Sequence, residues 1–159
     1  MKKLTTRNLT FAAVIAALYV GLTLATVQIS FGMWQVRIAE ALTILPILTP
    51  AAIPGVFVGC LISNLVAGVS TLDMIFGPLA TLSAAVLTYL LRKKPLIAAA
   101  PPVVINAFVV GAILNLAFGL PYWETAGWVG LGQLAACYAL GLPLYYALRK
   151  LPENVLPRG

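Results

Sequence analysis

The sequence predicts an all-α integral membrane protein in which residues 1–159 form one bundle of six transmembrane helices, with both termini cytoplasmic. Three observations support this fold class. Hydrophobic residues make up 62% of the chain and charged residues only 9%, whereas about a quarter of the residues of a soluble domain are charged. The hydrophobic residues form long runs, and the basic residues gather in short groups between the runs. A soluble chain of this length could not keep so much apolar surface out of water.

Six apolar segments are expected, because a helix needs about 20 apolar residues to cross the bilayer. The first, residues 9–29, exceeds the roughly 7–15 residues of a signal-peptide core and is expected to remain as a membrane helix. The second, residues 38–49, is too short to span alone and ends where Pro50 and Pro54 interrupt any helix. The other four segments cover residues 51–69, 72–91, 96–120 and 128–148.

The charged residues indicate how the segments are oriented. With six crossings, all basic residues except Arg37 fall on the same side as the two termini, and the positive-inside rule makes that side cytoplasmic. The acidic residues Glu40, Asp73 and Glu124 fall at the opposite, outer ends of the segments. The tryptophans also lie on the outer side, where they form either an interfacial belt or a surface on which a planar ligand stacks.

Polar side chains at these outer ends are the candidate substrate-binding residues. An ionisable group at membrane depth costs about 2.5–3.5 kcal/mol on insertion scales, so such groups face a cavity or one another. Arg37 and Glu40 would share one face of a helix that begins near Val36, either as an ion pair that anchors the helix end or as part of a ligand site. The full candidate set is Trp34, Gln35, Arg37, Glu40, Asn64, Asp73, Asn115, Trp123, Glu124 and Gln133.

This residue set suits a planar, nitrogen-rich ligand. A carboxylate accepts two parallel hydrogen bonds from adjacent N–H groups, and a carboxamide donates to a ring carbonyl. The face of a tryptophan adds stacking worth about 1–3 kcal/mol for each ring. From the residues alone, the ligand is expected to be a polar heterocycle or an amine.

The first segment carries two overlapping pairs of small residues. Ala12 pairs with Ala16 and Ala13 pairs with Ala17, and Gly21 follows one turn later. Small residues at this spacing allow another helix to approach closely in lipid. The pattern alone favours packing against the chain's own helices over contact with a partner.

Several functional classes find no support in the sequence. The chain has no histidine and lacks the patterns GxxxxGK[ST], HExxH, GxSxG and CxxC, so we expect no enzyme, metal site or ATPase. Cys60 and Cys137 lie in apolar runs and are expected to be packing residues. The few basic residues between apolar runs are typical of topology signals rather than of a nucleic-acid surface.

Three stretches of the chain resemble the queuosine-precursor transporter family (QueT type). They are SFGMWQVRIAEALTILP at 30–46, PGVFVGCLISN at 54–64 and LDMIFGPLATL at 72–82. Members of this family are substrate-binding S components of energy-coupling factor (ECF) transporters. The resemblance implies a six-helix bundle of the ECF S-component type in the plasma membrane of a prokaryote. It also implies capture of a 7-deazaguanine such as preQ1, or of queuine, from outside, with no cofactor in this chain.

The resemblance implies partners as well. An S component docks on the membrane coupling protein EcfT, which works with two cytoplasmic ATPase subunits that consume the ATP. S components meet the coupling protein through an AxxxA-type surface on helix one. The resemblance therefore changes the expected role of four alanines to a partner-helix contact: Ala12, Ala13, Ala16 and Ala17.

S components generally build their pockets from the outer ends of segments four to six, under a lid of outer loops. By resemblance, this favours one part of the candidate set: Asp73, Asn115, Glu124 and Gln133, with Trp34, Gln35 and Trp123 from loops. Asn106 is an alternative to Asn115, because nine residues place the two on opposite faces of one helix. The stretch SFGMWQVRIAEAL is expected to form the lid and rim of the pocket.

Other functions remain open at this point. The chain could be an S component for another vitamin or base, or a stand-alone homodimeric secondary carrier in which an acid couples transport to proton flow. An enzyme acting on lipid has less support, because the sequence shows no nucleophile–base pairing. A purely structural membrane subunit is a further alternative, and it should bind no small molecule tightly.

Overall fold

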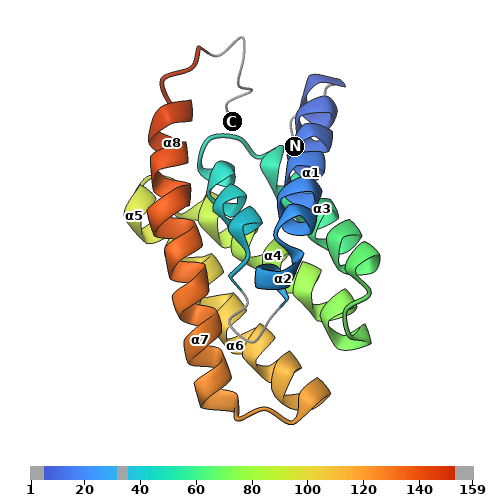
Figure 1. The fold of residues 1–159 in the computed structure, drawn as a ribbon. Coiled ribbons are helices and arrows are strands. Elements are labelled where there is room, and N and C mark those ends of the chain that lie inside the picture. Colours follow the sequence, from blue (N-terminus) through green and yellow to red (C-terminus); the bar gives the residue numbers. More distant parts are fainter. Residues whose placement is uncertain (1–5, 32–35, 153–159) are drawn as a thin grey trace.

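The computed structural model describes residues 6–31 and 36–152, which form helices and no strand. In chain order the elements are α1 (Thr6–Ala25), α2 (Val27–Ser30), the 3-10 helix η1 (Ile38–Ile47), α3 (Ala52–Ala67), α4 (Thr71–Leu90), α5 (Pro95–Ala98), α6 (Ala100–Phe118), α7 (Tyr122–Leu134), the π-helical η2 (Ala135–Gly141) and α8 (Leu142–Leu148). The start of α1 and the end of α8 lie at the same end of the bundle (Figure 1).

Four helical stretches of the described chain are long and apolar enough to cross a membrane. They are Thr6–Ala25, Thr71–Leu90, Pro95–Phe118 and Tyr122–Leu148, and two shorter apolar helices, Ile38–Ile47 and Ala52–Ala67, lie between the first two in the sequence. These stretches confirm the prediction of an all-helical chain with membrane-spanning helices. The last stretch begins at Tyr122 rather than near residue 128, so residues expected in a loop belong to its first turn.

The long C-terminal stretch includes a proline without a break. Pro143 has no backbone N–H with which to continue the helical hydrogen-bond pattern. The π-helical turn η2 lies just before Pro143 and accommodates the missing hydrogen bond. In this turn the backbone N–H of Leu142 donates to the carbonyl oxygen of Cys137, five residues earlier. The α7–η2–α8 stretch therefore remains one continuous helical rod.

Two glycines and a serine fix the helix ends at the α3–α4 turn and at the end of α6. Gly68 ends α3 at φ 64° and Gly119 ends α6 at φ 69°, and this left-handed conformation is unfavourable for residues with a Cβ. Ser70 then caps α4, because its hydroxyl accepts a hydrogen bond from the backbone N–H of Asp73 at 3.2 Å. The tight α3–α4 turn thus places Asp73 in the first turn of α4.

The 3-10 helix η1 occupies the inside of the bundle. Every residue from Ala39 to Ile47 is buried, and η1 packs against α1, α3, α4, η2 and α8. Most 3-10 helices are no longer than four residues. This one has 10 residues, contains Pro46 and is surrounded by other helices of the bundle. The acidic residue Glu40, in the first turn of η1, is consequently buried inside the bundle.

Helices α1 and α3 pack at very short range. A Cβ on Gly55 would stand 2.8 Å from the carbonyl oxygen of Ala12, and one on Gly59 would stand 2.6 Å from the Cβ of Tyr19. Ala12 and Ala16 are buried in the bundle, whereas Ala13 and Ala17 are exposed. The four alanines therefore divide into one pair on the internal face and one pair on the outside.

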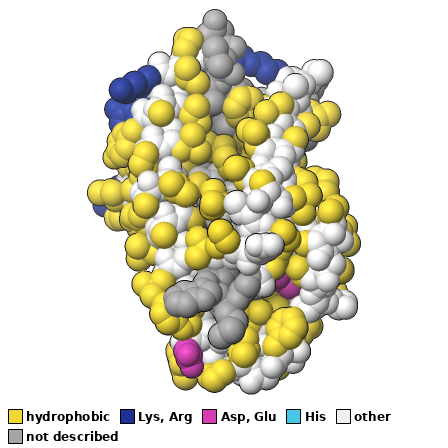
Figure 2. All heavy atoms as spheres, in the orientation of Figure 1, with side chains coloured by type: hydrophobic (Ala, Val, Ile, Leu, Met, Phe, Trp, Pro, Cys, Tyr) yellow, Lys and Arg dark blue, Asp and Glu magenta, His cyan; other side chains and the backbone are white. Residues whose placement is uncertain are grey.

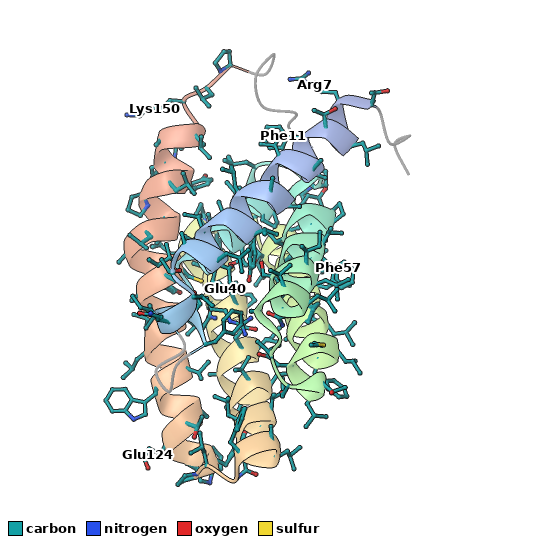
Figure 3. The ribbon with its side chains drawn as sticks, turned by 45° about the vertical axis from the view of Figure 1, so that its right-hand side comes forward. Arg7, Phe11, Glu40, Phe57, Glu124 and Lys150 are labelled. Carbon is teal, nitrogen blue, oxygen red and sulfur yellow. The ribbon has the colours of Figure 1, made fainter. Side chains whose placement is uncertain are left out.

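The charges divide between the two ends of the bundle. Arg7 and Lys150 lie at the end that holds the start of α1 and the end of α8, and Glu124 lies at the opposite end (Figure 3). Figure 2 shows the visible Lys and Arg side chains toward the first end and acidic side chains toward the second. The surface between these ends is largely hydrophobic, as expected for a bundle surrounded by lipid.

Candidate functional site

A buried ion pair joins the segment before η1 to the start of α4. Nη2 of Arg37 lies 2.9 Å from Oδ2 of Asp73, and the two side chains are only 4% and 5% exposed. The ion pair is therefore not the Arg37–Glu40 pair that helical spacing suggested. The reason is local: Arg37 is extended (φ −88°, ψ 99°) and only precedes a 3-10 helix, so its side chain leaves the face that carries Glu40.

Other side chains surround the guanidinium of Arg37. Its carbon atom lies 4.7 Å from the ring centroid of Phe31, a cation–π distance, and Nη1 lies 3.8 Å from Sγ of Cys60. Burial acts to lower the pKa of Arg37, but the combined attraction of several neighbouring acidic groups, with Asp73 the strongest, outweighs it, and the pKa lies above its usual value. Arg37 is thus held as a buried cation.

Asn64 and Gly77 complete the surroundings of Asp73. Nδ2 of Asn64 donates to the backbone carbonyl of Asp73 at 2.9 Å, which ties the end of α3 to the start of α4. A Cβ on Gly77 would stand 2.5 Å from Oδ1 of Asp73 and 2.9 Å from Nδ2 of Asn64. Only glycine leaves room for both side chains at this position.

Glu40 belongs to a second polar group that lies deeper in the bundle. Its side chain is labelled midway between the two ends in Figure 3, although the sequence suggested an outer position. The hydroxyl of Tyr19 donates to Oε1 of Glu40 at 2.5 Å, and Nδ2 of Asn106 donates to Oε2 at 3.3 Å. The difference arises because η1 folds into the core instead of continuing along the rim.

Two cysteines link this polar group to its neighbours. The hydroxyl of Thr81 donates to Sγ of Cys60 at 3.5 Å, and Sγ of Cys137 lies 4.0 Å from Oε1 of the buried Gln133. Both cysteines are free and buried, which confirms that they do not form a disulfide. They also contact polar atoms, a role that their apolar sequence context did not indicate.

A cavity of about 250 Å³ adjoins the Arg37–Asp73 pair. Its walls are Phe31, the α3–α4 turn from Ala67 to Ser70, Asp73, and Leu114 and Phe118 of α6. Aromatic, apolar and acidic groups thus meet around one space. A separate groove of about 330 Å³ between α4 and α6 is lined only by apolar side chains, including Phe76 and Phe108, and suits lipid better than a polar ligand.

The remaining candidate residues lie away from the buried groups. Asn115 donates to the carbonyl oxygen of Leu120 at 2.6 Å and so stabilises the end of α6. Trp123 is 77% exposed, and Glu124 is exposed beside it in the first turn of α7. Trp34 and Gln35 lie outside the described residues. The structure therefore brings together Arg37, Asn64 and Asp73 in one group and Glu40 and Gln133 in another.

Sequence reasoning missed Tyr19, Thr81 and the polar contacts of the cysteines, and it kept Asn106 only as an alternative. Tyr19 lies in an apolar helix that shows no distinct polar face, so no pattern marked it. In the structure Tyr19 lies directly opposite Gly59, but a single sequence does not reveal this contact.

These features define an integral membrane protein with charged and amide side chains gathered inside a helical bundle. The comparison with protein families makes the class more particular. The model of the QueT transporter family matches residues 9–150, so the chain belongs to the QueT transporter family and is a membrane transport protein. No significant match to a curated protein or to a solved structure was found.

Proposed function

We propose that this chain is the substrate-binding S component of an ECF transporter and that it captures a queuosine precursor of the 7-deazaguanine class. Family membership supports transport of a small molecule. The observation that carries the rest is the buried Arg37–Asp73 pair, whose Asp73 forms part of the wall of a small cavity. Buried charges at membrane depth are expensive, and they commonly mark substrate pathways.

The position of the cavity supports capture from outside. It lies at the α3–α4 turn and the end of α6, away from the basic residues that follow α4 and α8. By the positive-inside rule, the end with Arg92, Lys93, Lys94, Arg149 and Lys150 is cytoplasmic. The cavity then faces the outside, and both termini face the cytoplasm of a prokaryotic cell.

The size and lining of the cavity support a small planar ligand. Ligand pockets typically have volumes of about 300–1,000 Å³, so a cavity of about 250 Å³ fits one or two fused rings rather than a large cofactor. Phe31 and Phe118 provide aromatic walls, and Asp73 provides a carboxylate. A 7-deazaguanine offers a flat bicycle with adjacent N–H donors, which a carboxylate can bind.

The outer face of α1 supports docking to the coupling protein. Ala13, Ala17 and Gly21 are exposed and lie four residues apart, and a Cβ on Gly21 would meet no atom within 4 Å. This stripe is free of the contact with α3 that occupies Ala12 and Ala16. We assign it to the membrane coupling protein EcfT, with two ATPase subunits supplying the energy.

The direct test is ligand binding by the purified chain, followed through tryptophan fluorescence with preQ1, preQ0, queuine, guanine and riboflavin. We expect saturable, submicromolar binding of a 7-deazaguanine and much weaker binding of riboflavin. Asp73→Asn should lower the affinity at least tenfold, whereas the matched control Glu124→Gln should not, because Glu124 is exposed and is not among the residues that line the cavity. A folded chain that binds none of the 7-deazaguanines contradicts the substrate assignment.

One observation favours a second candidate, a stand-alone homodimeric carrier coupled to protons. Glu40 is a buried acid whose carboxylate oxygens receive hydrogen bonds from Tyr19 and Asn106, and buried acids of this kind occur in proton relays. Reconstitution separates the candidates. Uptake into liposomes that contain this chain alone supports the carrier, and uptake that needs the coupling protein, the ATPases and ATP supports the S component.

A further inference from the structure

We infer that Arg37, Asp73 and Asn64 together read one edge of the ligand, a 2-amino-4-oxopyrimidine edge. Nε of Arg37 donates to the ring carbonyl, Oδ1 of Asp73 accepts from the adjacent ring N–H, and Oδ1 of Asn64 accepts from the exocyclic amine. This assignment rests on the proposed function, since it deepens the description of the same site by giving each group its part in recognition.

The first evidence is a set of unpaired atoms. Among the residues that the structure describes, three buried side-chain nitrogen and oxygen atoms have no hydrogen-bond partner: Nε of Arg37, Oδ1 of Asp73 and Oδ1 of Asn64. Buried polar groups in folded proteins are nearly always paired, and an unpaired one calls for an explanation. All three belong to one cluster, so one ligand could satisfy them together.

The second evidence is their proximity. Arg37 and Asp73 are in contact at 2.9 Å, and the amide of Asn64 is bonded to the backbone of Asp73 at 2.9 Å. Oδ1 of Asp73 and the Asn64 amide both lie within 3 Å of the point where a Cβ on Gly77 would stand. Asp73 also forms part of the cavity wall. The three residues therefore form one contiguous cluster, and Asp73 connects this cluster to the wall of a space that can hold a ring.

The third evidence is the number of free donors and acceptors. The cluster offers one free donor and two free acceptors, and these need a ligand edge with one acceptor and two donors. A guanine-type edge has this composition: a carbonyl oxygen, a ring N–H and an exocyclic amine. A dioxo edge, as in xanthine, would set a second carbonyl oxygen against Oδ1 of Asn64. An adenine-type edge would set an unprotonated ring nitrogen against a carboxylate oxygen.

The test combines changes in the ligand with changes in the protein. Binding of 7-deazaguanine is compared with that of 7-deazahypoxanthine, which lacks the exocyclic amine, and of 6-thio-7-deazaguanine, which keeps the ring N–H but has a weakly accepting sulfur in place of the carbonyl oxygen. In the unmodified chain each change should weaken binding about 10- to 100-fold, because a buried partner is left unpaired. In Asn64→Ala the affinity for 7-deazahypoxanthine should be less than about threefold weaker than the affinity for 7-deazaguanine. The control Ser63→Ala, a buried neighbour whose hydroxyl bonds only its own helix in the described structure, should keep the full penalty.

A second variant tests the arginine independently, in case Asn64→Ala folds poorly. Arg37→Lys keeps a cation beside Asp73 but has no Nε. In this variant, changing the ring carbonyl of the ligand should no longer weaken binding, whereas removing the exocyclic amine should still weaken it. If 7-deazaguanine binds tightly and either folded variant retains its penalty unchanged, the edge assignment is overturned while the proposed function stands. If neither 7-deazaguanine nor preQ1, preQ0 or queuine binds the folded, unmodified chain, both are overturned.

Discussion

Arg37 and Asp73 are separated by 36 positions in the sequence and meet in a buried ion pair of 2.9 Å. The pair joins the segment that enters η1 to the first turn of α4, so it connects two of the three stretches that resemble the transporter family. A single contact thus links the start of the buried 3-10 helix, the tight α3–α4 turn and the cavity wall.

Breaking this pair on one side should destabilise the protein strongly. Arg37→Met or Asp73→Leu leaves an uncompensated charge inside the bundle, which typically costs about 3–5 kcal/mol. The double variant removes both charges and should be clearly more stable than either single variant. Thermal unfolding in detergent measures all three, and a double variant whose loss equals the sum of the single losses would show that the pair is not coupled.

The fold class was predictable because hydrophobic length is a local property. Runs of apolar residues predicted most of the helical stretches, and Pro50 marked the break before α3. The expectation that Pro54 also interrupts the helix was wrong, because Pro54 lies in the first turn of α3, where no backbone N–H is needed. The unexpected start of α7 has a physical reason as well. Trp123 and Glu124 are compatible with a helix start, because an acid in the first turn is favourable near the positive end of the helix dipole.

The site was less predictable because its contacts are long-range. Polar residues within apolar runs pointed to Arg37, Glu40, Asn64, Asp73 and Gln133, all of which are buried. Their partners did not follow from spacing: Arg37 reaches Asp73 rather than Glu40, and Glu40 reaches Tyr19, 21 positions before it. A 3-10 helix folded into the core changes which side chains meet, and no local pattern predicted it.

Gly77→Ala should damage ligand binding more than the fold. The added Cβ would stand 2.5 Å from Oδ1 of Asp73 and 2.9 Å from Nδ2 of Asn64, so the two side chains must move apart. We expect at least a tenfold loss of affinity for a 7-deazaguanine in a titration of the purified chain. Gly127→Ala is the matched control, since a Cβ there meets no atom within 4 Å. Equal affinity in the two variants would contradict the role of Gly77.

Tyr19→Phe should destabilise the inner polar group. Removing the hydroxyl leaves Oε1 of the buried Glu40 without this donor, at a cost of about 1–3 kcal/mol. Tyr138→Phe is the control, because its hydroxyl donates at 2.9 Å to the carbonyl oxygen of Leu96 at an exposed site, so its removal leaves no buried acidic group without a donor. Thermal unfolding should therefore show a lower midpoint for Tyr19→Phe than for Tyr138→Phe, and similar midpoints would argue that Glu40 does not depend on Tyr19.

Bulky substitutions on α1 should separate docking from folding. Ala13→Leu and Ala17→Leu add volume on the exposed stripe, so they should leave ligand affinity and thermal stability nearly unchanged but block co-purification with the coupling protein and the ATPases. Ala16→Leu should instead lower stability, because Ala16 is buried where α1 packs closely on Gly59 of α3. Ala117→Leu, an exposed position on α6, controls for added surface volume and should still co-purify. Normal assembly and ATP-dependent uptake by Ala13→Leu and Ala17→Leu would move the docking surface away from this face of α1.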